Sequence, residues 1–566
     1  MKSDIIVLGI HDGHNAGAAL IKNGCVAAAV QEERLVNEKN FSGAPVLSLQ
    51  KVFEISRIHP SDVNVIAIAG LINTHLSLKE RPLHVKMYER YAKLFSSHFV
   101  NAILVNFLHK WRKMGDLAKL FKEMNLENIE IQFIDHHTAH AACAYYQRPW
   151  TGETLVLTLD GAGDGLCSTV NIGRKNSLDR IAATTAYNSP GNVFYSEITG
   201  YLGLKRWEHE YKVMGMAPYG ISDLCIDHIR KIVRVNPKKP LEFENIFGAY
   251  VSHVQKKLIH LLAEQRFDNI SAATQQHFED ILTQWVTNAV HETGIHKIAC
   301  AGGMFLNVKG NKLLRELDII DDIFVYPAAS DEGIPVGAAM EGYYRFCERE
   351  GITPNKEILG PIYYGMEYDN EYIKKILIDS GWIEQSAFIP DIDQELGEKL
   401  AQGNVIARFK GRVEWGPRGL GNRSILADPR DLKVIRKLNF AIKHRDFWMP
   451  FAPSVLDERM QDYFINSRFA PYMIEAFDTT PKAEEIIAGL HPKDLTGRPQ
   501  AVNDWNTDYR KVLLSYQEIT GVGGILNTSF NLHGYPIVGT PEIAIHTLNQ
   551  SDLNGLAIGN WLVMKN

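Results

Sequence analysis

The sequence predicts an α/β protein with two domains, the first of which contains an internal duplication. The chain has 566 residues, which is too many for a single hydrophobic core. Apolar runs of strand length alternate with segments of helical periodicity, as in α/β proteins. The order strand, Asp-Gly turn, strand, turn, strand begins near residue 5 and recurs near residue 154. This recurrence predicts two related halves in the first domain.

The first copy of the pattern occupies the beginning of the chain. Apolar runs at residues 5–10, 16–21 and 25–30 are expected to form three strands. The Asn-Gly pair at residues 23–24 is typical of a tight hairpin, because these residues tolerate positive φ angles. A helix is expected at about residues 45–56.

The second copy lies in the middle of the chain. Strands are expected at residues 154–159, 167–172 and 181–185, and a glycine-rich turn at 160–165 follows the first of them. Glycine turns let backbone amides approach phosphate oxygens, so the matched turns predict a nucleotide-sized cleft between two halves. Each turn taken alone has a simpler interpretation, since Asp-Gly turns are common in hairpins.

Residues 71–130 separate the two copies and form a basic, aromatic stretch with helical periodicity. Such a stretch can bind an anionic substrate or a membrane surface. A pair of solvated amphipathic helices that caps the cleft is favoured, because apolar residues recur at helical spacing. The basic and aromatic residues are Lys86, Arg90, Lys93, Lys110, Arg112, Lys113, Tyr88, Tyr91, Phe95 and Phe107.

The composition argues against several classes of protein. The formal net charge of −6 gives no support to nucleic-acid binding. No apolar stretch is long enough to span a bilayer, and the first residues show no cleavage-site pattern. The six cysteines lie among apolar neighbours without a CxxC pair, which is typical of reduced, buried thiols. We therefore expect a cytoplasmic protein that binds neither nucleic acid nor a membrane.

Two histidines four residues apart, His136 and His140, are the strongest indication of chemistry. On a helix this spacing places both imidazoles on one face, within reach of a single cation. Asp160 ends a strand-like run, and Asp331 follows the strand expected at residues 323–326. The histidine pair predicts a metal site assisted by a carboxylate, which Asp160 could supply, and Asp331 stands at a natural position for a metal-directed carboxylate. The alternative for the histidine pair is a solvated or hydrogen-bonded helix face.

A second group of glycines follows a helix expected at residues 276–293. The strand expected at residues 296–301 runs directly into Gly302 and Gly303 and then reaches Asn307. Glycine turns that open helices are places where phosphate or nucleoside groups contact backbone N–H groups. We therefore expect this turn to contribute to a nucleotide site.

The second domain is expected to begin after a linker at residues 354–365, which contains two prolines and two glycines. We place the two domains at residues 1–355 and 356–566. Arginine presents a planar fork to phosphate or carboxylate oxygens, and there is no Walker A motif. A ligand such as ATP or an acyl phosphate is favoured over a surface ion-pair network with Glu414, Asp428 and Asp446. The basic residues are Arg408, Lys410, Arg412, Arg418, Arg423, Arg430, Lys443, Arg445 and Arg498, followed by the polar turn 527–531.

A series of motifs, in order along almost the whole chain, resembles the NodU/CmcH family of O-carbamoyltransferases, which includes aminoglycoside and cephem carbamoyltransferases. The motifs are Gly9-Ile10 with His14, Glu32-Glu33-Arg34 with Lys39, the block from His136 to His140, Asp160-Gly161, the run from Glu210 to Gly220, the turn from Gly302 to Asn307, the run from Ser330 to Gly333, the segment from Gly416 to Arg430, the run from Pro450 to Ser454, and the segment from Leu526 to Asn531.

The resemblance implies the architecture and the reaction. The first domain would be similar to the Kae-type branch of the actin/sugar-kinase/heat-shock superfamily, and the second would be a YrdC-like α/β domain. The second domain would make carbamoyl-adenylate from carbamoyl phosphate and Mg-bound ATP. The first would transfer the carbamoyl group to a hydroxyl of a small-molecule natural product or sugar. The family's metal site, usually iron, corresponds to His136, His140, Asp160 and Asp331, and another divalent transition metal would also suit these ligands.

The resemblance also implies roles for other residues. His14 would activate the acceptor hydroxyl as a general base; the alternative is a structural hydrogen bond in its turn. Lys39 with Arg34 would hold a carbamoyl or phosphate oxygen; the alternative is that both are surface charges. One residue departs from the family pattern, since Met449 stands where many relatives have arginine. Either Arg445 or Arg423 replaces the lost phosphate donor, or the affinity for carbamoyl phosphate is lower. The implied catalytic and nucleotide- or phosphate-binding residues are His14, Lys39, Gly161, Gly302, Gly303, Asn307, Arg418, Lys443, Arg445, Arg498, Ser529 and Asn531.

Other readings of the sequence stay open. A tRNA threonylcarbamoyl-type enzyme uses both implied folds, although the order of the domains and the absence of a basic face argue against it. A non-catalytic nucleotide-binding relative is the other alternative, and a homodimer is a candidate oligomeric state. The acceptor cannot be read from the sequence. Its choice is expected to depend on residues 71–130 and 185–210.

Overall fold

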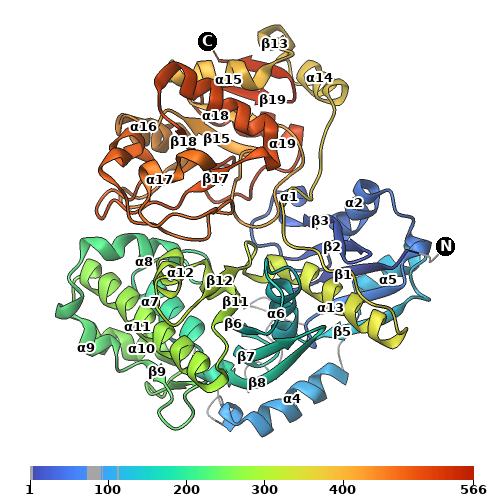
Figure 1. Ribbon diagram of the computed structural model, residues 1–566, viewed down its shortest axis with the longest axis vertical. Helices are drawn as coiled ribbons and strands as arrows, with labels where there is room; N and C mark the ends of the chain where they lie inside the picture. The colour runs from blue at the N-terminus through green and yellow to red at the C-terminus, as the bar shows by residue number, and fades with distance from the viewer. Residues whose placement is uncertain (1–3, 73–90, 92–93, 111–113, 251, 566) are drawn as a thin grey trace. The chain divides into compact units, whose positions relative to one another are not determined.

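The computed structural model describes residues 4–72, 91, 94–110, 114–250 and 252–565, which form two compact units (Figure 1). Unit 1 contains Met1–Ala29 and Ser42–Leu359, and unit 2 contains Val30–Phe41 and Gly360–Asn566. The short segment Val30–Phe41 therefore belongs to unit 2, although it lies near the beginning of the chain. Lys86, Tyr88, Arg90, Lys93, Arg112 and Lys113, which were expected in a basic helical stretch, lie outside the described residues, as do the side chains of Phe95 and Lys110.

The first sheet of unit 1 has the strand order β3-β2-β1-β4-β5. β1 pairs with β2 in antiparallel fashion and with β4 in parallel, and β4 is parallel to β5. Asn23 and Gly24 have φ angles of 51° and 82° between β2 and β3, as the Asn-Gly pair predicts. The strands are β1 (Ile6–His11), β2 (Gly17–Lys22), β3 (Cys25–Gln31), β4 (Val65–Ala69) and β5 (Glu130–Ile134).

The second sheet of unit 1 repeats this order, with β6 in the place of β1. Its strands are arranged β12-β11-β6-β7-β8, and the two hairpins are again antiparallel while β6, β11 and β12 are parallel. The duplication expected from the sequence is confirmed, and the fold is mixed α/β. The strands are β6 (Thr154–Gly163), β7 (Leu166–Arg174), β8 (Ser177–Thr185), β11 (Lys297–Ala301) and β12 (Asp322–Val325).

Two central helices of unit 1, α6 (His136–Tyr146) and α13 (Ile334–Arg349), pack tightly against each other. A Cβ atom at Gly337 of α13 would lie 1.9 Å from the carbonyl oxygen of Ala139 in α6, so only glycine allows this approach. The contact holds the start of α13, just after Asp331, against the helix that carries the two histidines.

The remaining helices of unit 1 surround the sheets or extend from them. The expected helices at 45–56, within 71–130 and at 276–293 are present as α2, as α4 and α5, and as part of α11. These elements are α2 (Val46–Ser56), α4 (His98–Lys110), α5 (Asp116–Glu123), α7 (Ser196–Tyr201), α8 (Glu210–Met216), α9 (Ile226–Ile229), α10 (Ser252–Leu261), α11 (Phe267–Thr293) and α12 (Val308–Arg315), with the hairpin β9 (Val233–Val235) and β10 (Phe243–Asn245).

Unit 2 is built on an eight-stranded mixed sheet with the order β13-β20-β19-β14-β15-β18-β16-β17. Two apolar clusters line it, one packed with α15 and α18 and the other with α14 and α19. The strands are β13 (Ser386–Phe388), β14 (Ile406–Phe409), β15 (Arg423–Ala427), β16 (Ala452–Leu456), β17 (Gln500–Val502), β18 (Gly524–Ser529), β19 (Gly555–Ile558) and β20 (Trp561–Met564). The helices are α1 (Glu33–Val36), α14 (Asn370–Asp379), α15 (Ile392–Ala401), α16 (Lys433–Leu438), α17 (Met460–Tyr463), α18 (Thr507–Thr520) and α19 (Pro541–Asn549).

Five of the six thiols are buried, as expected from the sequence. Cys25 is half-buried, the other five cysteines are buried, and all six are free thiols. Within the described residues, no helix combines the length and the apolar character needed to cross a membrane.

Candidate metal centre and anion site

The first turn of α6 is fixed by its N-cap residue, Asp135. The carboxylate of Asp135 accepts a hydrogen bond of 2.9 Å from the backbone N–H of Thr138, as an N-cap does. It also pairs with Arg180 of β8. Burial would raise the pKa of Asp135, but the Arg180 guanidinium outweighs it and lowers this pKa to about 2. The cap therefore stays charged and anchors the turn that carries His136.

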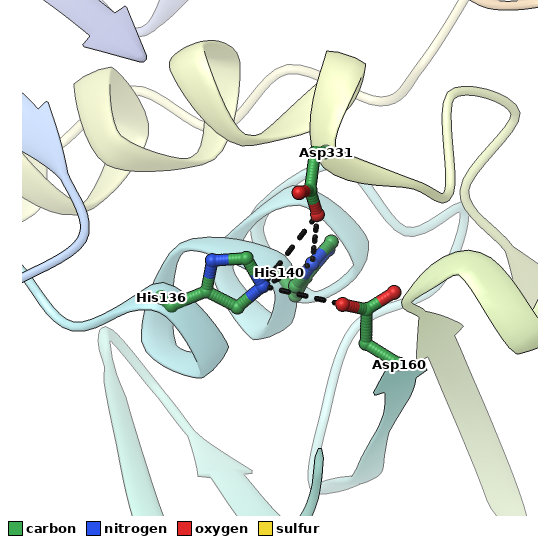
Figure 2. Close-up of side chains that lie close together, drawn as sticks. All are labelled: His136, His140, Asp160 and Asp331. Atoms are coloured by element: carbon green, nitrogen blue, oxygen red, sulfur yellow. Dashed lines mark hydrogen bonds and ion pairs between the residues drawn. The ribbon is translucent and has the colours of Figure 1, made fainter. Parts of the chain in front are cut away.

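His136, His140, Asp160 and Asp331 converge at one point in unit 1 (Figure 2). Four ligand atoms, one from each residue, all lie within 4.8 Å of one another. The Nε2 atoms of the two histidines are 3.1 Å apart. His136 Nε2 lies 3.5 Å from Asp160 Oδ2 and 3.5 Å from Asp331 Oδ1, and His140 Nε2 lies 3.4 Å from Asp331 Oδ1. The four residues predicted from the sequence are therefore brought together.

The electrostatics of this group favour a bound positive charge. Burial disfavours the charged form of His136, but the carboxylates of Asp331 and Asp160 outweigh it and raise the pKa of His136 to about 10. Burial alone would raise the pKa of Asp160, yet the contact with His136 and the charge of His140 hold it far below its usual range. The buried site thus favours the charged forms of both carboxylates together with a positive charge between them.

The donor set fits a divalent transition metal. Two imidazole nitrogens and two carboxylate oxygens suit zinc, iron or manganese. The Oδ1 atom of Asp331 is buried and makes no hydrogen bond of ordinary geometry within the described residues. A metal ion among the four side chains would coordinate this oxygen and relieve the close approach of the two Nε2 atoms. The geometry supports a metal centre and leaves the identity of the metal open.

Neighbouring groups orient the four side chains. Asp160 directs Oδ1 away from the histidines to accept a 2.9 Å hydrogen bond from the backbone N–H of Gly303. The carboxylate of Asp164 accepts hydrogen bonds from the N–H groups of His136, at 2.8 Å, and Leu71. Burial raises the pKa of Asp164. Such outer contacts fix ligand orientation in metal sites. Asp164 stands in the same acidic turn as Asp160, but no motif singled it out as a site residue.

His137 lies in the same helix as His136 and His140, but its side chain contacts the sheet and not the two carboxylates. Its Nδ1 atom is 2.8 Å from the hydroxyl of Thr158 in β6. Burial and the charges of His136 and His140 lower the pKa of His137 to about 3, so it stays neutral. The helix therefore turns two of its three histidines toward the carboxylates and the third toward the sheet.

Three of the predicted glycines line the metal cluster. Gly302 has a φ of 106°, and a Cβ there would lie 2.3 Å from the carbonyl oxygen of Leu159, so this position requires glycine. A Cβ on Gly303 would lie 2.9 Å from Asp160 Oδ1, and Gly161 directly follows that ligand. Backbone groups rather than side chains thus border the cluster here.

Asn307 has a structural task that the sequence analysis did not foresee. Its side-chain oxygen caps α12 by accepting a 3.0 Å hydrogen bond from Gly310 N–H. The same amide exchanges hydrogen bonds with Gln275 of α11. A part for Asn307 in nucleotide binding stays a prediction.

His14 lies in the loop that follows β1. The backbone oxygen of His14 is 3.0 Å from His11 Nε2, and His14 forms an isolated β-bridge with Ser42. The next residue, Asn15, lies 3.5 Å from the carboxylate of Glu332, which directly follows Asp331. The loop that carries His14 therefore borders the turn that carries a metal ligand, and the role of His14 as a base stays a prediction.

Unit 2 gathers a second charged site, which we call the basic cluster: Lys39, Arg418, Lys443, Arg445 and Arg498. Burial holds the pKa of Lys443 well below its usual range, and the charges of Arg445 and Lys39 lower it further. Burial likewise depresses the pKa of Arg498, followed by the charges of Arg418 and Arg445. These mutual effects place the five cations in one neighbourhood. Lys39 reaches it because Val30–Phe41 belongs to unit 2.

The polar turn after β18 holds Lys443. The Lys443 ammonium donates to the backbone oxygen of Ser529 at 2.5 Å and to the side-chain oxygen of Asn531 at 2.8 Å. The hydroxyl of Ser529 donates to the same Asn531 oxygen at 2.7 Å. The structure therefore brings Lys443, Ser529 and Asn531 together, as the sequence analysis grouped them.

The other arginines of the predicted group have structural partners. Arg408 pairs with Asp393, at 2.9 Å, and Arg430 pairs with Asp428, at 2.6 Å. Arg423 is fully buried and donates to four backbone carbonyls, those of Met366, Lys410, Gly411 and Asn422. The suggestion that Arg423 replaces the donor lost at Met449 is therefore wrong. Arg445, which belongs to the basic cluster, is the remaining candidate.

Comparison with known protein families matches both units. Residues 6–340 match the model described as carbamoyltransferase N-terminus, and residues 397–565 match the model described as carbamoyltransferase C-terminus. The chain therefore belongs to the carbamoyltransferase family and is a carbamoyltransferase-type enzyme.

Similar chains include nodulation proteins. Nodulation protein NolNO of Sinorhizobium fredii is 30% identical over 559 residues, which cover 98% of this chain and 79% of that protein. Nodulation protein NolO of Bradyrhizobium diazoefficiens is 31% identical over 440 residues, with coverages of 76% and 79%. An uncharacterized protein of Methanocaldococcus jannaschii is 30% identical over 578 residues, which cover 99% of this chain and 100% of that protein.

Solved structures resemble this chain only distantly. Full-length HypF in a phosphate- and nucleotide-bound form has 12% identity and a TM-score of 0.34, with coverages of 62% of this chain and 57% of that one. ROK hexokinase from Thermus thermophilus has 10% identity and a TM-score of 0.29, with coverages of 60% and 98%. Likenesses of this size establish nothing about function.

Proposed function

We propose that the protein is an O-carbamoyltransferase that works through carbamoyl-adenylate. Carbamoyl phosphate is hydrolysed to carbamate and phosphate. Carbamate then attacks the α-phosphate of Mg-bound ATP, which gives carbamoyl-adenylate and releases pyrophosphate. A hydroxyl of the acceptor attacks the carbamoyl carbon, its proton passes to a base, and AMP leaves with the bonding electrons. The products are an O-carbamoylated acceptor and AMP.

The observation that carries this proposal is the presence of two chemically different sites in a chain of the carbamoyltransferase family. Unit 1 holds the buried metal-ligating group, and unit 2 holds the basic cluster. A metal centre and an arginine-rich anion site suit two steps that both handle phosphate. A single-step transfer from carbamoyl phosphate would need only one of them.

In unit 2, which we take to be YrdC-like, the basic cluster would bind carbamoyl phosphate and the phosphates of ATP. Arginine forks match phosphate oxygens bidentately, and a buried ammonium adds a point charge. Ser529 and Asn531 hold Lys443 in place. Lys39, Arg418 and Lys443 would stabilise the charge that develops as pyrophosphate leaves.

In unit 1, which we take to be Kae-like, His136, His140, Asp160 and Asp331 would hold Fe(II) or another divalent transition metal. When bound, the metal supplies positive charge for the phosphate oxygens of the adenylate. Gly161, Gly302 and Gly303 border the cluster and would lie beside that phosphate. His14 would take the proton of the acceptor hydroxyl as a general base.

The acceptor is proposed only as a hydroxyl of a natural product or sugar. Incubation of the metal-loaded protein with carbamoyl phosphate, Mg-ATP and a panel of alcohols tests the proposal. We expect AMP and pyrophosphate in equal amounts and one acceptor that gains the mass of one carbamoyl group in place of hydrogen. A folded, metal-loaded protein that yields neither AMP nor pyrophosphate with any acceptor contradicts it.

A further inference from the structure

Trp207 has an unusual backbone conformation for so large a side chain. It lies between α7 and α8 with a φ of 63° in the left-handed region. A bulky residue is a genuine outlier there, and such strain is found where the surrounding structure imposes it, often at functional sites. The side chain is 44% exposed, so core packing does not account for this conformation.

The surrounding contacts fix the orientation of the indole. Its Nε1–H donates to the side-chain oxygen of Asn192 at 3.1 Å. The backbone N–H of Trp207 donates to the carboxylate of Glu210 at 2.6 Å. The guanidinium of Arg206 lies 5.5 Å from the ring centroid and is itself anchored to Glu197 at 2.7 Å. The indole is therefore held by the hydrogen bond at its Nε1–H edge and by the guanidinium of Arg206. Much of its surface is exposed to solvent.

The anchored edge of the indole lies near the residue that directly follows the metal ligand Asp160. The Asn192 oxygen that receives the indole N–H lies 2.8 Å from the position of a Cβ at Gly161, which directly follows Asp160. A Cβ on Gly191 would lie 3.1 Å from Gly161 Cα and 3.3 Å from the sulfur of Met304. Asn192 and the backbone of Gly161 thus lie between Trp207 and the metal ligand Asp160.

We propose that Trp207 is the platform on which the adenine ring of the nucleotide stacks in unit 1. This inference rests on the proposed function, in which the nucleotide phosphate lies at the metal cluster. The ribose would then lie over the glycine backbone. The planar base, which follows the ribose, would reach Trp207. A rigid indole offers a π-face to any base without hydrogen-bond readout, and its strained backbone places that face in advance.

The test compares two ligands that differ only in the base. Calorimetric titration of the metal-loaded, full-length protein with AMP and with ribose 5-phosphate gives both dissociation constants. In Trp207→Ala we expect the AMP constant to rise on the order of tenfold, because a stacked base is lost, while the ribose 5-phosphate constant is unchanged. Trp207→Phe keeps an aromatic ring and should recover most of the affinity for AMP.

The matched control is Trp505→Ala, which removes a tryptophan of similar exposure from unit 2 and should leave both constants unchanged. Equal weakening of AMP and ribose 5-phosphate by Trp207→Ala would overturn the inference, because it indicates a structural effect. An unchanged AMP constant would overturn the inference and leave the proposed function intact. A wild-type protein that binds neither ligand while it retains its metal would contradict the proposed function as well.

Discussion

At the scale of single residues, the metal cluster depends on how closely His136 is surrounded. A Cβ atom on Gly163 would lie 2.1 Å from the ring of His136, far inside any permitted contact. The histidine can take its position beside Asp160 only because residue 163 has no side chain. Gly163 stands at the end of β6, where the pairing with β7 shifts register.

We therefore predict that Gly163→Ala displaces His136 and weakens metal binding. The expected loss of metal affinity is about 10- to 100-fold, the size found when the support of a ligand is disturbed. Metal content by elemental analysis after dialysis measures it. Gly360→Ala is the control, because a Cβ there meets no heavy atom within 4 Å in the described structure. Unchanged metal content in a folded Gly163→Ala variant contradicts this prediction.

Lys443 gives a prediction about pH. Burial, with the charges of Arg445 and Lys39, lowers the pKa of Lys443 well below its usual range, so a neutral fraction exists at lower pH than for an exposed lysine. A bound phosphate dianion favours the charged form and raises this pKa. Phosphate binding should therefore take up protons, and phosphate affinity should fall as the pH rises through the pKa of the bound state.

Titration with inorganic phosphate in two buffers of different ionisation enthalpy measures this proton uptake. The apparent binding enthalpy should differ between the buffers for the wild type, and the difference should shrink in Lys443→Met. Identical enthalpies in both buffers for the wild type would show that Lys443 does not change its protonation when phosphate binds.

At the scale of residues, the sequence was most informative where the spacing of two residues determines which helix face they share. The interval from His136 to His140 is one helical turn, so the face they share followed from local geometry. Asp160 and Asp331 each follow a strand-like run, and the family resemblance joined them to the histidines. Arg423 could not be judged in this way, because only the tertiary structure shows that its guanidinium is occupied by four carbonyls.

At the scale of elements, the segment Val30–Phe41 is the feature with the largest consequence. Its helix α1 carries Arg34, whose side chain is buried and donates to the backbone oxygens of Glu414 and Gly416. The Glu414 side chain in turn accepts hydrogen bonds from three backbone N–H groups of the loop that follows. Arg34 thus ties the segment that carries Lys39 to the loop that carries Arg418.

Arg34→Ala should destabilise unit 2 and loosen the basic cluster. Two buried carbonyls lose a charged donor, and we expect a loss of about 2–3 kcal/mol in the free energy of unfolding. Denaturant unfolding followed by circular dichroism measures it. Glu38→Ala changes an exposed residue of the same segment and should cost little. Equal stability of Arg34→Ala and the wild type would show that the segment is only loosely attached.

The sequence predicted most elements and erred at their ends. The Asn-Gly turn located the first hairpin, because the pair tolerates the positive φ angles that the structure shows. Helix α11 was expected from Gln276 and begins at Phe267 instead. Its N-cap residue, Arg266, makes no side-chain capping bond, so no capping residue marked the start. The attachment of Val30–Phe41 to unit 2 depends on contacts with residues about 380 positions later. No pattern within the segment itself predicts this attachment.

At the scale of the whole molecule, we propose that each unit carries out one of two consecutive steps. The family match, the metal-ligating group of unit 1 and the basic cluster of unit 2 support two consecutive steps in one chain. The repeated strand order of unit 1 could be predicted from matched turns. The specific acceptor could not be predicted, because no motif in the sequence encodes its chemistry.

The most direct test measures the two steps separately in two variants. Exchange of labelled pyrophosphate into ATP, dependent on carbamoyl phosphate, reports adenylate formation, and release of AMP with an acceptor reports transfer. His140→Ala should keep pyrophosphate exchange near the wild-type rate and lose carbamoyl transfer. Lys443→Met should lose pyrophosphate exchange. His137→Gln, on the same helix as His140, is the control for folding. Loss of the exchange in a folded His140→Ala protein would contradict the division of the two steps between the units.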